Sequence, residues 1–526
     1  MAVFGEDSMT NREDKKRDVK PPSLLDALIP IIVLVFLLMM AIVLYGDAGI
    51  TGPIQVALML TMLVAAAVGL KNGHRLEDMG KAAVDGISSA MGAIFILLAV
   101  GSLIGTWNMA GTIPTIVYYG VQFLDPAWYY LASAVISAVL ALSIGSAWTV
   151  AGTLGIGLIG IAGALGVSPE ITAGAVISGA YFGDKMSPLS ETTNLAPAVA
   201  GTDLYTHIKG MLWTTVPSII IALVIFGVIG YRGEAAGALD LSKVLEAIRS
   251  VFNVGLLTLI PLLVVLILSF RRVSAFVTIF LGALVGGVMA VILQPDVVVA
   301  FGGGDALSTP LAMLKGVWSA MATGFVIESG YPGLDALFSQ GGMVSMMETV
   351  WLILSAMAFG GVMENSGLLA RLIQSVLKAA KSDRFLLAAT GLTSIGVNII
   401  AGDQYMAIVL PGRMYREAYK KHGIAPQTLS RQIEDTGTIT SPLIPWNSCG
   451  AYMSATLSIA TLAYLPFCFF NWINVIISFL YAAFGFQIKH LAPEEMPTEH
   501  PEEAAFYGIG GQQISPKEHE RLATAN

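Results

Sequence analysis

The residues best suited to chemistry form a short polar stretch between two long apolar segments. It reads Gly183-Asp-Lys-Met-Ser-Pro-Leu-Ser-Glu-Thr-Thr-Asn-Leu-Ala-Pro197. Polar, irregular backbone survives inside a bilayer only where it is buried in protein or lines a watery cavity. Carboxylate, hydroxyl and carbonyl oxygens are the ligands that hard cations prefer. The candidate ligands in this stretch are Asp184, Ser187, Glu191, Thr192, Thr193 and Asn194.

A second polar stretch repeats this pattern later in the chain. It reads Thr438-Ile-Thr-Ser-Pro-Leu-Ile-Pro-Trp-Asn-Ser448, and its Ser441-Pro442-Leu443 matches Ser187-Pro188-Leu189. Proline lacks a backbone N–H and obstructs a helix, so a proline frees carbonyl groups that could bind an ion. The prolines expected to break helices are Pro188, Pro197, Pro442 and Pro445. The second stretch adds the candidate ligands Thr438, Ser441, Asn447 and Ser448.

Three charged residues in or near these stretches could have roles other than ion binding. Lys185 is expected to be a charge partner for its neighbour Asp184, or an anchor at the membrane interface. Glu434 and Asp435 precede the second stretch by about one helical turn. They are expected either to flank the ion site or to pair with Arg431 at the cytoplasmic edge.

The composition of the chain is that of a polytopic membrane protein. Of the 526 residues, 55% are hydrophobic and 12% are charged, and the mean hydropathy is +0.74. Soluble domains carry about 25% charged residues. A transmembrane helix needs about 20 apolar residues, so the apolar segments predict about 10 to 13 spans. The lipid bilayer is therefore the first expected partner.

The two halves of the chain resemble each other in the spacing of glycines and polar residues. The matched glycines are Gly105 with Gly361, Gly111 with Gly367, Gly145 with Gly402, and Gly166 with Gly423. The charge changes where the copies diverge, because Asp403 replaces Ser146 and Glu364 replaces Asn108. Glu364 and Asp403 are therefore further candidate carboxylates.

Basic residues indicate that the two repeats have opposite orientations. Arg413, Arg416, Lys420 and Lys421 follow one hairpin of the second copy, whereas the matching loop near Gly166 has no basic residue. Because cytoplasmic loops are rich in lysine and arginine, these two loops should lie on opposite sides of the membrane. The predicted fold is an all-α polytopic membrane protein with two inverted-topology repeats, re-entrant hairpins and proline-broken helices. This is the architecture of secondary transporters.

The domain organisation follows from the repeats and the polar tails. A basic tail at residues 1–22 predicts a cytoplasmic N-terminus. The first membrane repeat is expected at 23–230, an inter-repeat loop at 231–250, and the second membrane repeat at 251–488. A polar C-terminal tail is expected at 489–526.

Several other classes of function are disfavoured. The glycine clusters at Gly302-Gly303-Gly304 and Gly341-Gly342 precede no Lys-Ser or Lys-Thr pair, so a nucleotide site is not expected. The two cysteines, Cys449 and Cys468, do not have zinc spacing. We therefore expect no enzyme, no nucleic-acid partner and no cofactor other than the transported ions. The energy for transport must come from an ion gradient.

Residues 183–197 and the stretch Glu434-Asp-Thr-Gly-Thr-Ile-Thr-Ser-Pro-Leu-Ile-Pro-Trp-Asn-Ser-Cys-Gly-Ala-Tyr452 resemble the NhaC family of sodium/proton antiporters. The resemblance covers most of residues 25–485 and implies a multi-pass protein of the bacterial cytoplasmic (inner) membrane. The family belongs to a wider group of ion transporters that is thought to share inverted repeats. It also contains members that exchange organic acids, such as malate against lactate, with coupling to sodium.

We therefore expect an antiporter with a carboxylate that binds a sodium ion or a proton, but never both at once. Burial favours the protonated carboxylate and a bound cation favours the ionised one, so each ion displaces the other. Asp184 is the first choice for the carboxylate that binds this metal ion, sodium, and Asp403 is the second choice. The expected partners are sodium ions, protons and lipid, with a homodimer as one compatible assembly. The alternative is a sodium-coupled organic acid or amino-acid transporter, in which helix N-termini would hold the substrate carboxylate.

Overall fold

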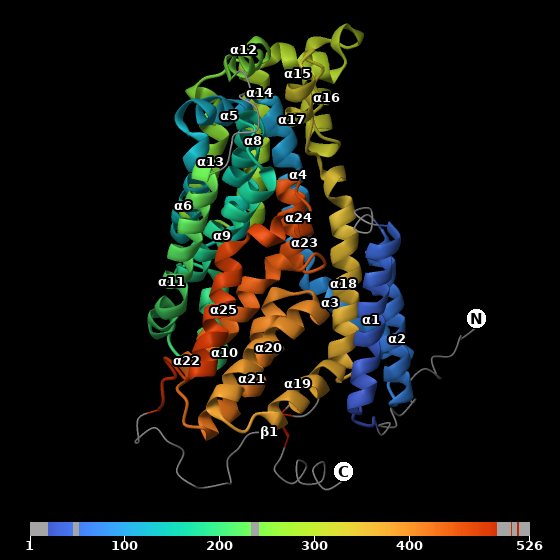
Figure 1. Ribbon diagram of the computed structural model, residues 1–526. Helices are drawn as coiled ribbons and strands as arrows, with labels where there is room; N and C mark the ends of the chain where they lie inside the picture. Colours follow the sequence, from blue (N-terminus) through green and yellow to red (C-terminus); the bar gives the residue numbers. More distant parts are fainter. Residues whose placement is uncertain (1–18, 46–51, 233–240, 492–505, 508–512, 515–526) are drawn as a thin grey trace, which may run out of the picture.

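The computed structural model describes residues 19–45, 52–232, 241–491, 506–507 and 513–514 (Figure 1). Within these residues the protein is helical, apart from strands β1 (Phe506–Tyr507) and β2 (Gln513–Ile514), which pair antiparallel. The predicted tails at 1–22 and 489–526 lie largely outside the described residues. The all-α class predicted from the sequence is confirmed.

The first half of the chain begins with long helices and then becomes interrupted. Its helices are α1 (Leu24–Tyr45), α2 (Pro53–Lys71), α3 (Leu76–Ser89), α4 (Met91–Met109), α5 (Thr112–Phe123), η2 (Pro126–Trp128), α6 (Tyr129–Ile144), α7 (Ala147–Val150), the π-helical turn η3 (Ala151–Gly155), α8 (Ile156–Leu165), α9 (Pro169–Met186), α10 (Glu191–Ala200) and α11 (Leu204–Arg232). Helix α9 packs closely on α6, because Gly179 and Gly183 leave no side chain between α9 and the α6 backbone.

The second half consists of helices in the same order, together with further helices. These helices are α12 (Leu241–Val251), η4 (Leu256–Leu259), α13 (Ile260–Phe270), α14 (Ala275–Leu293), α15 (Pro295–Gly302), η5 (Gly304–Ala306), α16 (Thr309–Ala322), α17 (Pro332–Phe338), η6 (Met343–Met346), α18 (Met347–Asn365), α19 (Leu368–Ala379), α20 (Asp383–Ala401), α21 (Gln404–Lys421), α22 (Pro426–Ile433), the π-helical turn η7 (Glu434–Thr438), η8 (Ser441–Leu443), α23 (Ser448–Leu457), α24 (Thr461–Tyr464), η9 (Leu465–Phe467) and α25 (Phe469–Phe484). The inter-repeat segment predicted as a loop at 231–250 therefore contains most of helix α12. From α13 on, the second half follows the order of the first, with further helices between α14 and α18: α13 packs on α14 as α1 packs on α2, and α14 packs on α4 as α2 packs on α18.

The described residues include nine helices that are long and apolar enough to cross a membrane, or up to eleven if each of two bent helix pairs is one span. Large apolar side chains such as Val139, Ile220 and Val288 are more than half exposed on these helices. Exposed apolar faces of this extent suit contact with lipid. The protein is thus a polytopic membrane protein, as its composition predicts.

The element order repeats between the halves and the backbone details repeat with it. Gly145 ends α6 with φ 78°, and Gly402 ends α20 with φ 67°, a left-handed conformation that favours glycine. Ser146 then caps α7 and Asp403 caps α21 through a side-chain oxygen. These shared positions are what an internal repeat predicts.

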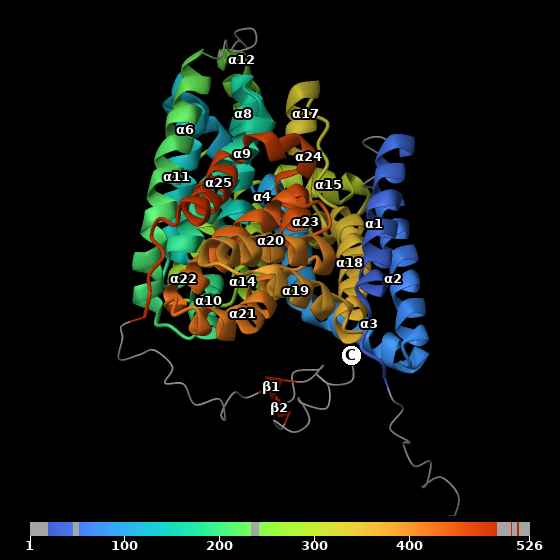
Figure 2. The ribbon, with the colours of Figure 1, turned by 60° about the horizontal axis from the view of Figure 1, so that its bottom comes forward.

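The corresponding elements lie at opposite ends of the molecule. Helix α8, which completes the hairpin of the first half, lies near the top of Figures 1 and 2, and its counterpart α21 lies near the bottom in both views. Helices α5 and α19, which also correspond, are at the top and the bottom of Figure 1. This arrangement agrees with inverted repeats.

The orientation can be tested by labelling single cysteines with a membrane-impermeant reagent in a variant lacking Cys449 and Cys468, both of which are buried. Lys421 at the end of α21 and Ser308 beside α16 are exposed. Because the basic end of α21 should be cytoplasmic, we expect outside reagent to label Ser308→Cys but not Lys421→Cys. Labelling of both residues from outside would contradict the inverted arrangement.

Candidate ion-binding site

The first polar stretch is a break between helices α9 and α10, as Pro188 predicts. Ser190 caps α10 by accepting a hydrogen bond from the Thr193 N–H. The Thr193 hydroxyl donates to the last carbonyls of α9, at 3.2 Å to Asp184 and 3.0 Å to Lys185. The side chains of this break therefore satisfy helix ends that a membrane would otherwise leave without partners.

Asn194 and Ser187 complete this local network. The Asn194 amide donates to the carbonyl oxygens of Pro188 at 3.0 Å and Ser190 at 2.6 Å. The Ser187 hydroxyl accepts from the Leu189 N–H at 3.3 Å. Both side chains therefore stabilise the conformation of the break. The sequence predicts that this break binds an ion.

The second polar stretch is also broken, in a more extended way. After α22 the chain makes a π-helical turn over Glu434–Thr438 and a short 3-10 turn that contains Pro442, and Pro445 precedes the start of α23. Ser441 donates to the Thr438 carbonyl at 2.7 Å. Pro442 and Pro445 thus lie in a helix break, as the sequence predicts.

Pro197 does not break a helix, and that prediction is wrong. Pro197 lies inside α10, which continues to Ala200 and ends at Gly201 with φ 89°. A single proline removes one helical hydrogen bond, here the one that the Thr193 carbonyl would accept, but need not end a helix. The end of α10 is set by the left-handed residue at Gly201 instead.

The N-termini of four helices gather at these two breaks. Gly145, just before α7, lies against Leu189 and Ser190 at the start of α10. In the second half, the Ser448 N–H at the start of α23 donates to the Gly402 carbonyl beside α21 at 2.9 Å.

Side chains join the two pairs of helix N-termini. Tyr405 at the start of α21 donates a hydrogen bond to Glu191 at the start of α10. Trp148 on α7 stacks on Tyr452 of α23 with ring centroids 4.0 Å apart. Helix N-termini carry a partial positive charge, so this region stabilises carboxylates or a bound anion.

The two carboxylates expected to bind sodium are both buried, with 8% of each residue exposed. Asp403 caps α21 by accepting from the Met406 N–H at 2.9 Å, and it also faces Ser448. Asp184 lies in the last turn of α9, where it faces the Ser190 hydroxyl and the Ala147 N–H at the start of α7. Asp184 therefore lies between the two polar elements of the first half, whereas Asp403 has a capping role of its own.

Glu191 and Glu364 lie at the margin of this region. Both residues are exposed, and Glu191 accepts the hydrogen bond from Tyr405. Glu364 is in the last turn of α18, where its charge interacts with Arg413 and Asp403. Neither carboxylate is enclosed as Asp184 is.

A fully buried ion pair next to Asp184 joins the two halves of the chain, and the sequence did not indicate it. Lys185 Nζ lies 2.5 Å from Asp435 Oδ1, and both side chains are 0% exposed. Lys185 therefore pairs with Asp435 rather than with Asp184, and Asp435 pairs with Lys185 rather than with Arg431. The same Asp435 oxygen accepts from Thr214 at 2.9 Å and from Asn474 at 3.2 Å. The pair thus ties η7 to α9, α11 and α25.

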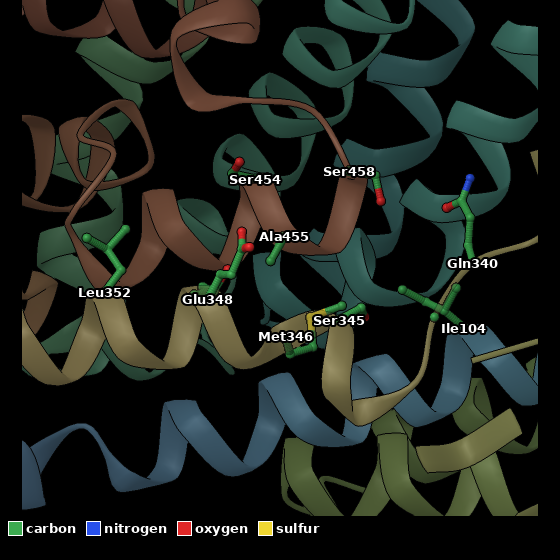
Figure 3. A pocket seen from close by; sticks show the side chains of 11 residues that line it. Ile104, Gln340, Ser345, Met346, Glu348, Leu352, Ser454, Ala455 and Ser458 are labelled. Carbon is green, nitrogen blue, oxygen red and sulfur yellow. The ribbon is translucent and has the colours of Figure 1, made fainter. Parts of the chain in front are cut away.

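A cavity of about 440 Å³ opens beside α23, away from the breaks. Figure 3 shows Glu348 on α18 and Ser454 on α23 in its walls, with Ser458 and Gln340 toward one end. Ser454 and Ser458 belong to the C-terminal end of the helix whose N-terminus is at Ser448. The cavity therefore lies about one short helix length from the breaks.

Known proteins resemble this chain along most of its length. The sequence model described as the Na+/H+ antiporter family matches residues 179–486. The Na(+)/H(+) antiporter NhaC of Alkalihalophilus pseudofirmus is 37% identical over 85% of this chain and 94% of its own. This chain belongs to the Na+/H+ antiporter family. The resemblance to NhaC noted in the sequence is thereby confirmed.

Other relatives are named for different activities. NhaC of Bacillus subtilis is 35% identical over 81% of this chain and 91% of its own. The malate-2H(+)/Na(+)-lactate antiporter of B. subtilis is 31% identical over 89% of this chain and 96% of its own. A second sequence model, the C4-dicarboxylate anaerobic carrier, matches residues 5–233. The three relatives are all named antiporters, and the solutes in their names differ.

The helix breaks can be tested by restoring helix-forming residues. Alanine is about 3 kcal/mol more favourable than proline in a helix interior, so Pro188→Ala and Pro442→Ala should extend the helices and withdraw carbonyls from the site. We expect transport to be largely lost while the protein still inserts into the membrane. Pro217→Ala, within the continuous helix α11, is the matched control and should remain active. Full activity of both break variants would mean that the breaks do not shape the site.

Proposed function

We propose that this protein is a secondary transporter that exports Na+ in exchange for H+ by alternating access. The observation that supports this most is Asp184, a buried carboxylate at the meeting point of a broken helix and a hairpin tip. Membership of the Na+/H+ antiporter family supports the same conclusion. Intramembrane carboxylates are expensive to bury and commonly mark ion pathways.

The chemistry requires only groups of this chain and the two transported ions. With Asp184 ionised, a sodium ion can replace part of its hydration shell with oxygens of Asp184, Thr192 and the broken backbone. Protonation of the carboxylate removes the negative charge and releases the sodium ion. If the site opens to one side of the membrane at a time, an inward proton gradient drives sodium outward.

The direct test uses purified protein in proteoliposomes with a pH-sensitive dye inside and no organic solute present. A pulse of external Na+ should move protons out of the vesicles, and choline chloride at equal ionic strength should not. Sodium uptake, measured separately with 22Na+, should persist when a protonophore is added. A silent wild-type protein in this assay, with protein confirmed in the vesicles, would contradict sodium/proton antiport.

A second candidate function is sodium-coupled exchange of organic acids. The gathering of four helix N-termini favours it, because their partial positive charge could hold a substrate carboxylate. The malate-2H(+)/Na(+)-lactate antiporter, a relative of this chain, is named for an exchange of this kind. The same vesicles distinguish the two functions, since an organic-acid exchanger should show labelled malate or lactate counterflow. It should also need an organic acid for sodium-linked proton movement.

We further propose the cytoplasmic membrane of a bacterial cell as the location, with a cytoplasmic N-terminus. The hydrophobic helices and the relatives support a membrane location. The basic tail that motivates the orientation lies largely outside the described residues, which begin at residue 19. A division into membrane repeats at 23–230 and 251–488, and a homodimer, remain parts of this proposal.

A further inference from the structure

We propose that Glu434 is a second carboxylate ligand of the transported cation, in a site that it shares with Asp184, Thr192 and Thr438. The proposal rests on the cation transport proposed above and adds a binding residue to it. The site bridges the two halves of the chain, because Asp184 and Thr192 come from the first repeat and Glu434 and Thr438 from the second.

Among the carboxylates that the structure describes, Glu434 is the only one with both oxygens buried and without a hydrogen-bond partner. Its side chain is 0% exposed, and neither carboxylate oxygen has a hydrogen-bond partner within the part of the chain that the structure describes. Buried polar groups are normally hydrogen-bonded, because an unpaired group loses its hydration without compensation. A buried carboxylate with both oxygens unpaired therefore indicates a ligand.

Thr438 shares this property on the same side of the same turn. Its hydroxyl is also fully buried and has no partner among the described residues. Glu434 and Thr438 are four residues apart at the two ends of the π-helical turn, and the Thr438 and Thr192 hydroxyls lie beside the Glu434 carboxylate. Single π-helical turns occur frequently at functional sites. The Glu434 carboxylate thus lies beside hydroxyl oxygens from both halves of the chain.

The buried charges near Glu434 are unequal, because the carboxylates Asp184, Glu434 and Asp435 outnumber the cations Lys185 and Arg431. The negative charges of Asp184 and Glu434 are close enough to repel each other. Lys185 is near Glu434, but its ammonium group is in contact with Asp435. Like charges in a buried site disfavour each other strongly, and a cation between them removes the repulsion.

The donor set identifies the class of ligand. Two carboxylates and two hydroxyls provide only oxygen, the ligand atom that hard cations such as Na+ prefer. No group of three or more His, Cys, Asp or Glu side chains suited to a metal ion occurs in the described ranges. The site is therefore suited to a cation of low charge rather than to a resident transition metal.

Asp184 and Thr438 occupy corresponding positions in the two repeats. Asp184 precedes Ser187-Pro188 by the same number of residues as Thr438 precedes Ser441-Pro442. In an inverted repeat, corresponding positions of the broken helices approach each other near the middle of the membrane. Asp184 and Thr438 can therefore contribute to one site from opposite halves.

Direct binding of 22Na+ to purified, detergent-solubilised protein at one fixed pH tests the proposal without transport. Glu434→Gln keeps the size of the side chain and removes its charge, so sodium affinity should fall about tenfold or more, as for loss of a charged partner. Thr438→Val should weaken binding by a smaller factor, and Glu434→Asp should fall between wild type and Glu434→Gln. Glu417→Gln, at an exposed position on α21, is the matched control and should bind sodium as wild type does.

The outcomes separate this proposal from the proposed function. Wild-type protein that binds no sodium, and moves no protons with sodium in vesicles, contradicts cation transport itself. If the wild-type protein binds sodium and Glu434→Gln binds it with the same affinity, only the assignment of Glu434 is overturned. If Glu434→Gln does not give monodisperse protein, Thr438→Val and Glu434→Asp decide, and wild-type affinity in both overturns the proposal.

Discussion

Replacing Asp184 with asparagine is expected to abolish sodium-driven proton movement while the protein remains folded and inserted. Asparagine keeps the size and one oxygen of the side chain, but it can neither release a proton nor carry a negative charge. Asp184 lies between the Ser190 hydroxyl and the start of α7, so the neutral amide can still be accommodated there. The measurement is sodium-induced proton flux in proteoliposomes without organic solute.

Two further variants make this result specific. Asp184→Glu keeps the carboxylate on a longer arm and should give weakened exchange with a changed apparent sodium affinity. Asp403→Asn is the matched control, since asparagine caps a helix about as well as aspartate and the capping of α21 at Met406 should survive. Normal flux in Asp184→Asn would remove Asp184 from the mechanism. Loss of flux only in Asp403→Asn would transfer the role to Asp403.

The local features of the site could be predicted from the sequence because each has a local cause. A proline interrupts a helix through its own ring, so Pro188 and Pro442 indicated both breaks. Gly145 and Gly402 indicated matched turns, because a left-handed residue at a helix end is usually glycine. The apolar segments and the repeat then predicted the class of fold.

Pro197 shows where local reasoning fails. The same ring that breaks the chain at Pro188 is accommodated within α10, since only one helical hydrogen bond is lost there. Whether a proline ends a helix depends on how neighbouring elements pack. The sequence contained no measure of that packing.

The pairing of buried charges could not be predicted either. Lys185 has Asp184 as its neighbour in the chain, yet its ammonium group contacts Asp435 in the other half. Adjacent side chains on a helix do not face each other, whereas distant residues meet through the fold. For the same reason the sequence indicates for Glu434 only a place beside the ion site or a pair with Arg431, although its carboxylate lies beside Thr192 of the first half.

Breaking the Lys185–Asp435 pair is expected to destabilise the protein more than any other single charge change outside the cation site. Both side chains are fully buried, and removing one member of such a pair leaves the other charge without compensation, at about 3–5 kcal/mol. Lys185→Met and Asp435→Leu should each lower the thermal unfolding temperature in detergent. The double variant should recover much of the loss, because an apolar pair can replace a buried ion pair at little cost. A double variant that is less stable than either single variant would contradict this account.

The ion pair between Lys71 and Asp26 provides the control that isolates burial as the cause. Its atoms are also 2.5 Å apart, and its carboxylate is buried as well, with the Asp26 side chain 6% exposed, but the Lys71 side chain is 66% exposed. An exposed lysine gains little from pairing, and Asp26 keeps its two hydrogen bonds from Ser23 when Lys71 is replaced, so the expected cost is about 1 kcal/mol or less. Lys71→Met should therefore leave the unfolding temperature nearly unchanged. Since the two pairs have the same separation and both carboxylates are buried, a large difference between Lys185→Met and Lys71→Met can be attributed to the loss of solvent around Lys185. Equal effects would mean that this buried pair contributes no more to stability than a surface pair does.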